Sequence, residues 1–561
     1  MAWQRLREPA VVVAITAFVA LISQQWAGLD TPDSSFYASL SLFGDQVTDR
    51  APIDSYYWTR LGYIAPVQFL HGIFGVGGGF IAWRVLLILL LTGSIYVALR
   101  RFTNISSATF LTIIGSLSSV TLSYLGNTYL TGTVLAGTAV AMAAALFDGK
   151  RAALVAGVAL GWLVMVNPPG ALLAGTLWLA IRLQARISSM RDDTAKGVAF
   201  DIVFAAIAAA VTFIGFWIIG RILFPGLDWF GTYLESNARI DYSNFASADA
   251  VWLRDISLIV PFAIAVTVVI AWFTHRSERA AQRALVISLT SIAFMLVFNP
   301  LMGGIPLEAP MYQAMLWPPA MLALCLVTTM ALPDTKWTAL QIIVGAIAVA
   351  VVVGAGYLAL GLSLLVGWII AVAIVTIFLV SAYKRTVGAI AGLAVLLGGA
   401  QLLQNSRDDL GLYYLSPYQW AYASNPISDR LDTAITVQEW LLANTTRDDA
   451  ILGWVDGDWV NGDRELYVVA GMQLWGENRV TLEPTLTDTD GLARLDTYRP
   501  DVIAMYGQTK ESVLQFWQSI PSANNATAPT CLDFDWAPNP ASKFTVDKGV
   551  ACLTRLTWGP A

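Results

Sequence analysis

The chain has 561 residues, of which 56% are apolar and only 13% are charged. Soluble proteins are about 45–50% apolar and 25% charged, so this composition excludes a soluble globular protein and indicates a polytopic membrane protein. The net charge of −6 says little about partners, because in a membrane protein the positions of Lys and Arg carry the information.

The first apolar run, 9–27, follows Arg5 and Arg7 and lacks a small-residue cleavage site after it. This arrangement predicts an uncleaved signal-anchor with a cytoplasmic N-terminus. The run is therefore the first predicted membrane span.

Two carboxylates, Asp30 and Asp33, follow this span directly and open a long polar loop, 28–79. Ionisable groups at a membrane boundary cost free energy unless water, a partner or a ligand compensates them, which makes them functional-site candidates. The alternative is an exit turn and a helix N-cap, which explains one carboxylate better than two.

The rest of this loop contains two segments that are too short to span, 34–44 and 65–74. Their mixed apolar and polar residues predict helices lying in the membrane interface. The neighbouring Trp58 and Trp83 fit an aromatic belt, and His71 is interpreted as interfacial packing.

Further apolar runs bring the prediction to about 13 spans. They cover 80–99, 108–125, 131–147, 152–166, 170–183, 199–224, 256–273, 285–301, 312–332, 338–356, 357–382 and 387–403. The sequence Asn167-Pro168-Pro169-Gly170 predicts a tight reversal between two of them.

Basic residues occupy every second loop, which predicts that these loops are cytoplasmic. They are short and contain no Gly-rich phosphate loop, so a cytoplasmic nucleotide-driven reaction has no evident site. The loops 28–79, 126–130, 225–255 and 302–311, together with the C-terminal segment, are predicted to be external.

Three stretches resemble a known family. They are Asp33-Ser34-Ser35-Phe36-Tyr37, the run from Tyr56 to Tyr63, and the run from Tyr312 to Pro319. With the predicted topology, they resemble the GT-C glycosyltransferases, and among these the bacterial relatives of the polyprenyl-phosphate-mannose protein mannosyltransferases and of the lipid A aminoarabinose transferase. The resemblance implies an all-α polytopic membrane domain over 1–404 and a small external α/β domain over 405–561.

The resemblance also implies a function. Such enzymes transfer a sugar from a polyprenyl-phosphate donor to a glycan, lipid or protein acceptor at the external face of the cell membrane. The chemistry requires a base for the acceptor hydroxyl and cations for the departing lipid phosphate. Asp33 stands at the position of the family's carboxylate and is the predicted base, while no nucleic-acid partner is expected.

Arg60 and Arg84 are the preferred ligands of the donor phosphate, because the guanidinium fork donates two hydrogen bonds to such a group. Snorkelling at the membrane interface is the alternative role of Arg84. The remaining candidates for substrate contact are Asp30, Tyr37, Tyr57, Asn127, Tyr129, Glu308 and Tyr312.

One departure from the family concerns the turn 126–132, which lacks the second acidic residue that many relatives carry there. A two-carboxylate site and a metal site are therefore not carried over, although the need for a divalent metal stays open. Glu308 is the other carboxylate that could complete the cavity, and a solvated loop carboxylate is its alternative role.

The C-terminal segment predicts a helix at 433–443 and buried strands at 450–454, 480–482 and 501–506. Cys531 and Cys552 form an even pair in a predicted oxidising compartment, which favours a disulfide. Two other classes of function stay open at this point: a transporter or flippase of lipid-linked sugars, and a non-catalytic membrane assembly or receptor protein.

Overall fold

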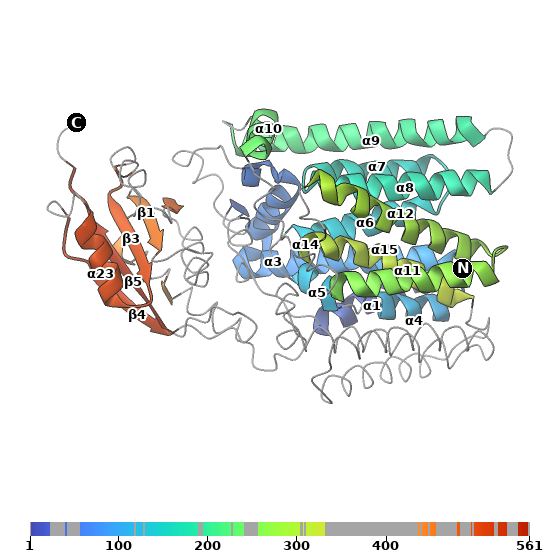
Figure 1. Cartoon of the computed structure of the whole chain (residues 1–561), viewed down its shortest axis with the longest axis horizontal. Coiled ribbons are helices and arrows are strands. Elements are labelled where there is room, and N and C mark those ends of the chain that lie inside the picture. Colours follow the sequence, from blue (N-terminus) through green and yellow to red (C-terminus); the bar gives the residue numbers. More distant parts are fainter. Residues whose placement is uncertain are drawn as a thin grey trace.

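The computed structural model describes residues 2–22, 37, 40, 41, 56–116, 119–126, 130–188, 194–225, 228–239, 256–302, 307, 310–330, 436, 437, 440, 441, 443–446, 449–455, 479–482, 495, 499–520, 526–535 and 548–558. Within these residues the chain forms a bundle of apolar helices and a small sheet, and the sheet lies beyond the end of the bundle that carries α10 (Figure 1).

Apolar helices make up the described part of the membrane domain. They are α1 (Ala2–Ile22), α3 (Leu61–Arg100), α4 (Ile105–Ser116), α5 (Ser119–Gly126), α6 (Thr131–Ala145), α7 (Lys150–Val164), α8 (Pro168–Ile187), α9 (Thr194–Leu223), α11 (Ile256–Thr274), α12 (Arg279–Leu301) and α15 (Trp317–Thr329). Shorter elements are η1 (Tyr56–Thr59), α10 (Trp229–Arg239), α14 (Pro310–Gln313) and η4 (Ala314–Leu316).

Three described segments are long and apolar enough to cross a membrane: Gly78–Arg100, Gly197–Leu223 and Arg279–Leu301. Large aliphatic side chains also lie on the outside of the bundle, including Val211 (64% exposed) and Ile222 (72% exposed) on α9. An apolar exterior of this kind suits lipid rather than water. The count of about 13 spans stays a prediction, because 331–435 lie outside the described residues.

Helix α3 consists of two helical segments joined at Gly75, which has φ 73° and ψ 177°. A positive φ favours glycine, since it lacks the Cβ that crowds this conformation. The interfacial segment and the following span, predicted as separate helices, therefore meet at this kink. His71 packs its ring against Phe80 with 4.4 Å between centroids, and its interfacial location stays a prediction.

The predicted reversal at Asn167 is confirmed. Helix α7 ends at Val164 and α8 begins at Pro168, and the Asn167 Oδ1 accepts a hydrogen bond from the Gly170 N–H at 3.1 Å. This is an N-cap with proline in the first helical turn, where proline removes no helical hydrogen bond.

The C-terminal sheet has the strand order β2-β1-β3-β5-β4. The strands are β1 (Ala450–Val455), β2 (Arg479–Leu482), β3 (Val502–Gly507), β4 (Thr530–Asp535) and β5 (Lys548–Arg555), with helix α23 (Lys510–Ser519) beside them. The first three strands, which are parallel, match the predicted ones. Five described residues of the predicted helix 433–443 are helical, and so is Asn444. Strands β4 and β5 and helix α23 were not predicted.

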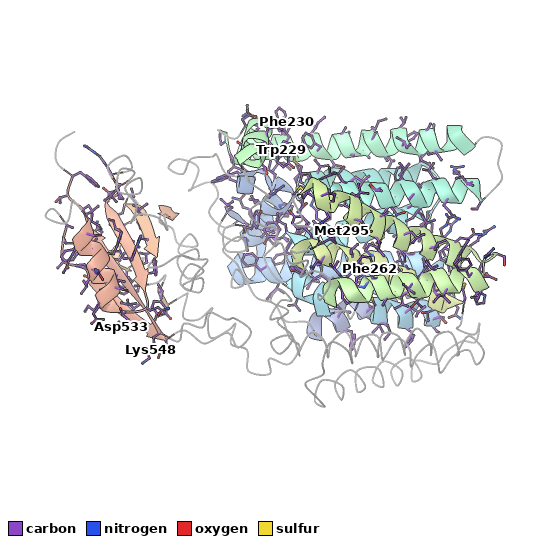
Figure 2. The ribbon with its side chains drawn as sticks, in the orientation of Figure 1. Trp229, Phe230, Phe262, Met295, Asp533 and Lys548 are labelled. Atoms are coloured by element: carbon purple, nitrogen blue, oxygen red, sulfur yellow. A yellow bond between two sulfur atoms is a disulfide. The ribbon has the colours of Figure 1, made fainter. Side chains whose placement is uncertain are left out.

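The two cysteines of this domain occupy directly opposite positions on the antiparallel strands β4 and β5 and form the expected disulfide. Near the end of the same strand pair, Asp535 faces Lys548; Figure 2 labels Lys548 and the neighbouring Asp533. The core of the domain includes Trp454 and Phe516, whose rings stack with 3.6 Å between centroids. The small C-terminal α/β domain thus has a core of its own.

Candidate functional site

Arg60 is a buried cation at the beginning of α3, with an exposed fraction of 9%. Its carbonyl accepts hydrogen bonds from the N–H groups of Tyr63 and Ile64 at 2.9 and 3.0 Å, which starts the helix. Its guanidinium carbon lies 5.9 Å from the centre of the Tyr233 ring on α10. Cation–π contact compensates part of the cost of burying this charge. Arg60 therefore places a positive charge in a region of low dielectric constant, where its attraction for an anion is strongest.

Helix α10 holds the residue before Arg60. The Trp229 Nε1 donates a hydrogen bond to the carbonyl of Thr59 at 2.7 Å, although the two residues are 170 positions apart in the chain. The Trp229 and Tyr233 rings stack at 5.3 Å with an angle of 2°. The same helix thus fixes the backbone beside Arg60 and supplies the ring under its guanidinium; Figure 2 labels Trp229 and Phe230 at this end of the bundle.

The end of α7 and the turn after it fix the backbone on the C-terminal side of Arg60. The Gly62 N–H donates to the Met165 carbonyl at 2.9 Å, and the Trp162 Nε1 donates to the Gly62 carbonyl at 2.8 Å. A Cβ at Gly62 would come within 2.7 Å of the Val166 Cγ2. Only glycine permits this close backbone approach. Arg60 is thus positioned by two elements that are remote from it in sequence.

A chain of edge-to-face aromatic rings runs from the acidic loop into the bundle. Tyr37 contacts Tyr63 (6.1 Å), Tyr63 contacts Trp83 (6.0 Å), and Trp83 contacts Trp162 (6.1 Å). Among the described residues, the buried Tyr63 hydroxyl and Trp83 Nε1 have no hydrogen-bond partner. Leaving such a group unsatisfied costs about 1–3 kcal/mol. A ligand with acceptor oxygens would satisfy both groups.

Neither of these two donors was predicted to have a role in the site. Tyr63 was named only within a stretch that carried the family resemblance, and Trp83 was assigned to an aromatic belt. The available signal was chemical: a tyrosine or tryptophan placed deep in an apolar segment still requires a partner for its polar atom.

Arg84 lies in the spanning part of α3 and is half-buried. Its Nη2 donates a hydrogen bond to the carbonyl of Ala20 on α1, so the side chain links two neighbouring helices. A guanidinium has five donors, and this contact uses one of them. The contact is compatible with a phosphate role and also with a purely structural one.

Tyr312 lies against a small apolar cluster of Leu258, Met295, Leu307 and Leu316, together with Phe262. Figure 2 labels Met295 and Phe262 in this part of the bundle. The next residue, Gln313, is fully buried and donates from Nε2 to the Leu307 carbonyl at 2.6 Å. Its Oε1 has no partner among the described residues. Gln313 is therefore a further polar group in the third motif, and it was not predicted.

Several predicted site residues lie outside the described part of the chain: Asp30, Asp33, Asn127, Tyr129 and Glu308, as well as the side chain of Tyr57. The assignment of Asp33 as base therefore stays a prediction. Within the described residues, no three His, Cys, Asp or Glu side chains gather to hold a metal ion.

The sequence matches no family model and no curated protein. The structure, however, superposes on ArnT from Cupriavidus metallidurans bound to undecaprenyl phosphate, with a TM-score of 0.55 over 98% of both chains and 14% identity. The apo form of the same protein matches with a TM-score of 0.55 and 15% identity.

The fold is that of the GT-C membrane glycosyltransferases. The chain also resembles the oligosaccharyltransferase AglB from Archaeoglobus fulgidus in complex with an inhibitory peptide and a dolichol-phosphate, with a TM-score of 0.48, 11% identity, and coverage of 90% of this chain and 70% of that chain. The family resemblance predicted from the three sequence stretches is thus confirmed at the level of the fold. The match to ArnT extends over 98% of this chain and therefore includes the C-terminal domain.

Proposed function

We propose that the chain is a membrane glycosyltransferase that takes its sugar from a polyprenyl-phosphate donor. The observation that carries the proposal is the structural match to ArnT, which extends over 98% of both chains. The matched ArnT structure is bound to undecaprenyl phosphate. The buried cation at Arg60 supports it, because a lipid phosphate requires a positive group near the membrane boundary.

On the donor side, Arg60 binds the phosphate that becomes the leaving group, and Arg84 assists it. Tyr63 and Trp83 donate hydrogen bonds to oxygens of the same donor. These groups stabilise the negative charge that develops on the lipid phosphate when the bond between sugar and phosphate breaks. Because the backbone on both sides of Arg60 is fixed before the donor arrives, little reorganisation is needed.

On the acceptor side, Asp33 removes the proton from the acceptor hydroxyl while the hydroxyl oxygen attacks the anomeric carbon of the sugar. The glycosidic bond to the acceptor forms, the bond to the phosphate breaks, and polyprenyl phosphate leaves. Asp30, Tyr37, Tyr57, Asn127, Tyr129, Glu308 and Tyr312 are proposed to contact the two substrates. The acceptor is a glycan, lipid or protein at the external face, with the N-terminus in the cytoplasm and the C-terminal domain outside.

The test is a transfer assay with purified protein in liposomes that contain radiolabelled polyprenyl-phosphate sugars and a panel of envelope acceptors. Asp33→Asn should lower turnover by roughly 100-fold or more, because a general base contributes about that much to the rate. Its unfolding temperature should equal that of the parent. Asp45→Asn, the same change in the same loop, is the matched control. Parent turnover in Asp33→Asn would remove the assigned base.

The donor side is tested in the same assay. Arg60→Gln should raise the KM for the donor more than Arg60→Lys, because lysine keeps the charge and loses only the fork. Arg221→Gln removes an exposed arginine near the end of α9 and is the control. Movement of the labelled lipid across the bilayer without release of polyprenyl phosphate would instead identify a flippase.

A further inference from the structure

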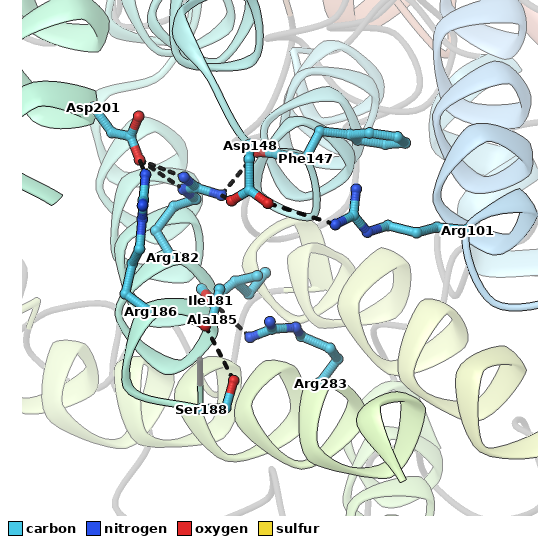
Figure 3. A network of polar contacts seen from close by, with 10 residues as sticks. All are labelled: Arg101, Phe147, Asp148, Ile181, Arg182, Ala185, Arg186, Ser188, Asp201 and Arg283. Carbon is cyan, nitrogen blue, oxygen red and sulfur yellow. Dashed lines mark hydrogen bonds and ion pairs between the residues drawn. The ribbon is translucent and has the colours of Figure 1, made fainter. Parts of the chain in front are cut away.

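A second cluster of charged residues lies at the other end of the bundle, away from Arg60. It is formed by Arg101, Asp148, Arg182, Arg186, Asp201 and Arg283 (Figure 3). The three candidate spans all have one end here: one ends at Arg100, one begins at Gly197, and one begins at Arg279. The cluster therefore lies at a membrane surface.

Both carboxylates of the cluster are shared between two arginines. Asp201 accepts from Arg182 and also pairs with Arg186 at 3.4 Å. Asp148 pairs with Arg182 at 2.8 Å and with Arg101 at 3.7 Å. The side chains of Arg182 and Asp201 are each only 3% exposed, so this pair is buried. With Arg283, the described part of the cluster holds four guanidinium groups and two carboxylates, an excess of two positive charges among these six residues.

Arg283 is the member of the cluster that none of the described carboxylates neutralises. It is half-buried on α12, and its Nη1 donates to the carbonyl of Ile181 on α8 at 3.1 Å, a contact that Figure 3 shows. The positive charges of Arg101 and Arg182 repel the Arg283 guanidinium, and among the described carboxylates Asp148 attracts it. A half-buried guanidinium in this setting gains free energy from an anion.

The two helices that carry this contact indicate where that anion comes from. On α8, Leu183 is 39% exposed and Ile187 is 68% exposed, and on α12 Leu289 is 48% exposed. Exposed aliphatic side chains on the same two helices as a cation, near a membrane surface, fit a molecule that has both a phosphate and acyl chains. A soluble phosphate would pair with the guanidinium but would leave the apolar surface uncovered.

We propose that this end of the bundle binds the headgroup phosphate of an anionic phospholipid between Arg283 and Arg101. The phosphodiester oxygens accept hydrogen bonds from the free donors of both guanidinium groups, and an acyl chain lies along α8 and α12. The site is separate from the one proposed for glycosyl transfer, and its occupation does not depend on that function.

The test measures lipid binding to the full-length protein in detergent. Native mass spectrometry and thermal unfolding are recorded with phosphatidylglycerol, with phosphatidylcholine and with inorganic phosphate. Phosphatidylglycerol should remain bound and raise the unfolding temperature, whereas phosphatidylcholine and inorganic phosphate should not. Equal stabilisation by phosphatidylcholine would overturn the proposal, and equal stabilisation by inorganic phosphate would show a soluble-anion site instead.

Variants locate the site. Arg283→Gln should weaken phosphatidylglycerol binding by roughly tenfold or more, the loss expected for a hydrogen bond to a charged group. Arg276→Gln removes an exposed arginine that stacks on Trp272 and Phe273, and it should bind the lipid like the parent. If Arg283→Gln does not fold, Arg101→Gln and Arg283→Lys replace it. Arg101→Gln should bind the lipid more weakly, whereas Arg283→Lys should bind it like the parent. Parent affinity in both Gln variants would overturn the assignment.

Discussion

At the scale of single residues, the candidate site contains buried polar atoms that have no partner among the described residues. The Tyr63 hydroxyl and the Trp83 Nε1 are the clearest cases, and both lie in one chain of aromatic contacts. Such groups lower the stability of the ligand-free protein and become satisfied only when a ligand binds. Function and stability therefore oppose each other at these positions.

This opposition makes Tyr63→Phe informative. The substitution keeps the ring contacts and removes only the hydroxyl, so the unfolding temperature should stay the same or rise while donor turnover falls several-fold. Tyr63→Leu also removes the contacts with Tyr37 and Trp83 and should destabilise the protein by about 1–3 kcal/mol. The measurements are thermal unfolding in detergent and donor kinetics. A Tyr63→Phe variant that is destabilised as much as Tyr63→Leu would assign the hydroxyl a structural role.

The sequence predicts which residues are chemically suited to the site better than it predicts what holds them. Arg60 is recognisable because cations are few on the predicted external face. The two hydrogen bonds that fix its flanks come from Trp229 and Met165, and no local pattern connects these residues with Arg60. The position of a charge depends on contacts between distant elements, which periodicity in one dimension does not describe.

At the scale of elements, helix α10 shows the same limit. It lies within a segment predicted as an external loop, and its Trp229, Phe230, Tyr233 and Leu234 repeat at helical spacing over only 11 residues. The strands β1, β2 and β3 were predicted because each contains a short apolar run. In the edge strand β4 only Phe534 is buried and the other five residues are exposed or partly buried, so its apolar signal is weak. The structure of β4 depends on pairing with β5.

The close approach at Gly62 gives a test of how the site is held. Gly62→Ala forces a methyl group against the Val166 side chain and the Trp162 carbonyl, and we expect a loss of about 1–3 kcal/mol together with weaker donor use. Gly72→Ala is the matched control, because nothing lies within 4 Å of its Cβ position. That change should stabilise the helix by up to about 1 kcal/mol. Thermal unfolding of the two variants side by side distinguishes them, and equal stability would contradict the close approach.

In the C-terminal domain, Asp449 connects the region before β1 with the end of β5. Its carboxylate accepts hydrogen bonds from Arg555 at 3.0 and 2.8 Å and from the Thr446 N–H at 2.6 Å. The Arg555 guanidinium holds the pKa of Asp449 below its ordinary value, and the Thr446 N–H contributes in the same direction. The unfolded chain therefore binds more protons than the folded domain as the pH falls.

It follows that this contact stabilises the domain fully above the ordinary pKa of an aspartate, about 3.9, and that the stabilisation is lost as the pH falls through the lowered value. Asp449→Asn should lower stability at neutral pH and weaken the acid dependence. Arg555→Lys should give an intermediate result, because it keeps the charge and loses the fork. Pulsed hydrogen exchange of the β1 and β5 amides, with labelling at one fixed pH, measures the stability at neutral pH and its dependence on acid. An unchanged acid profile in Asp449→Asn would contradict the prediction.

At the scale of the whole molecule, the two charged regions lie at opposite ends of the helices. The beginning of α1 and the end of α3 are joined by the Glu8–Arg100 ion pair at 2.9 Å, and the arginine cluster lies at the same end. Arg60 and α10 lie at the other end, and the sheet lies beyond it (Figure 1). The arginine cluster lies at the end of the bundle where the basic loops are, and the cytoplasmic location of this end stays a prediction.

Thiol labelling in intact cells tests this orientation. In a Cys325→Ala background that keeps the Cys531–Cys552 disulfide, a cysteine at Ser34 should react with a membrane-impermeant reagent. A cysteine at the exposed Ser188 should react only after the cells are opened. The opposite pattern would place the acidic loop in the cytoplasm and remove the support for a lipid-phosphate donor at the external face.

The kink at Gly75 has a consequence for how the two candidate phosphate ligands are spaced. Arg60 directly precedes α3 and Arg84 lies within it, and inside α3 only Gly75 departs from helical geometry. A helix has a fixed rise and rotation per residue, so the distance and the relative direction of the two guanidinium groups depend on the torsion angles of that one glycine. Nothing lies within 4 Å of its Cβ position, so the backbone angle itself, rather than lack of space, requires glycine there. Gly75 is therefore the one joint between the two helical arms of α3, and its backbone angles set the separation of the two candidate phosphate ligands.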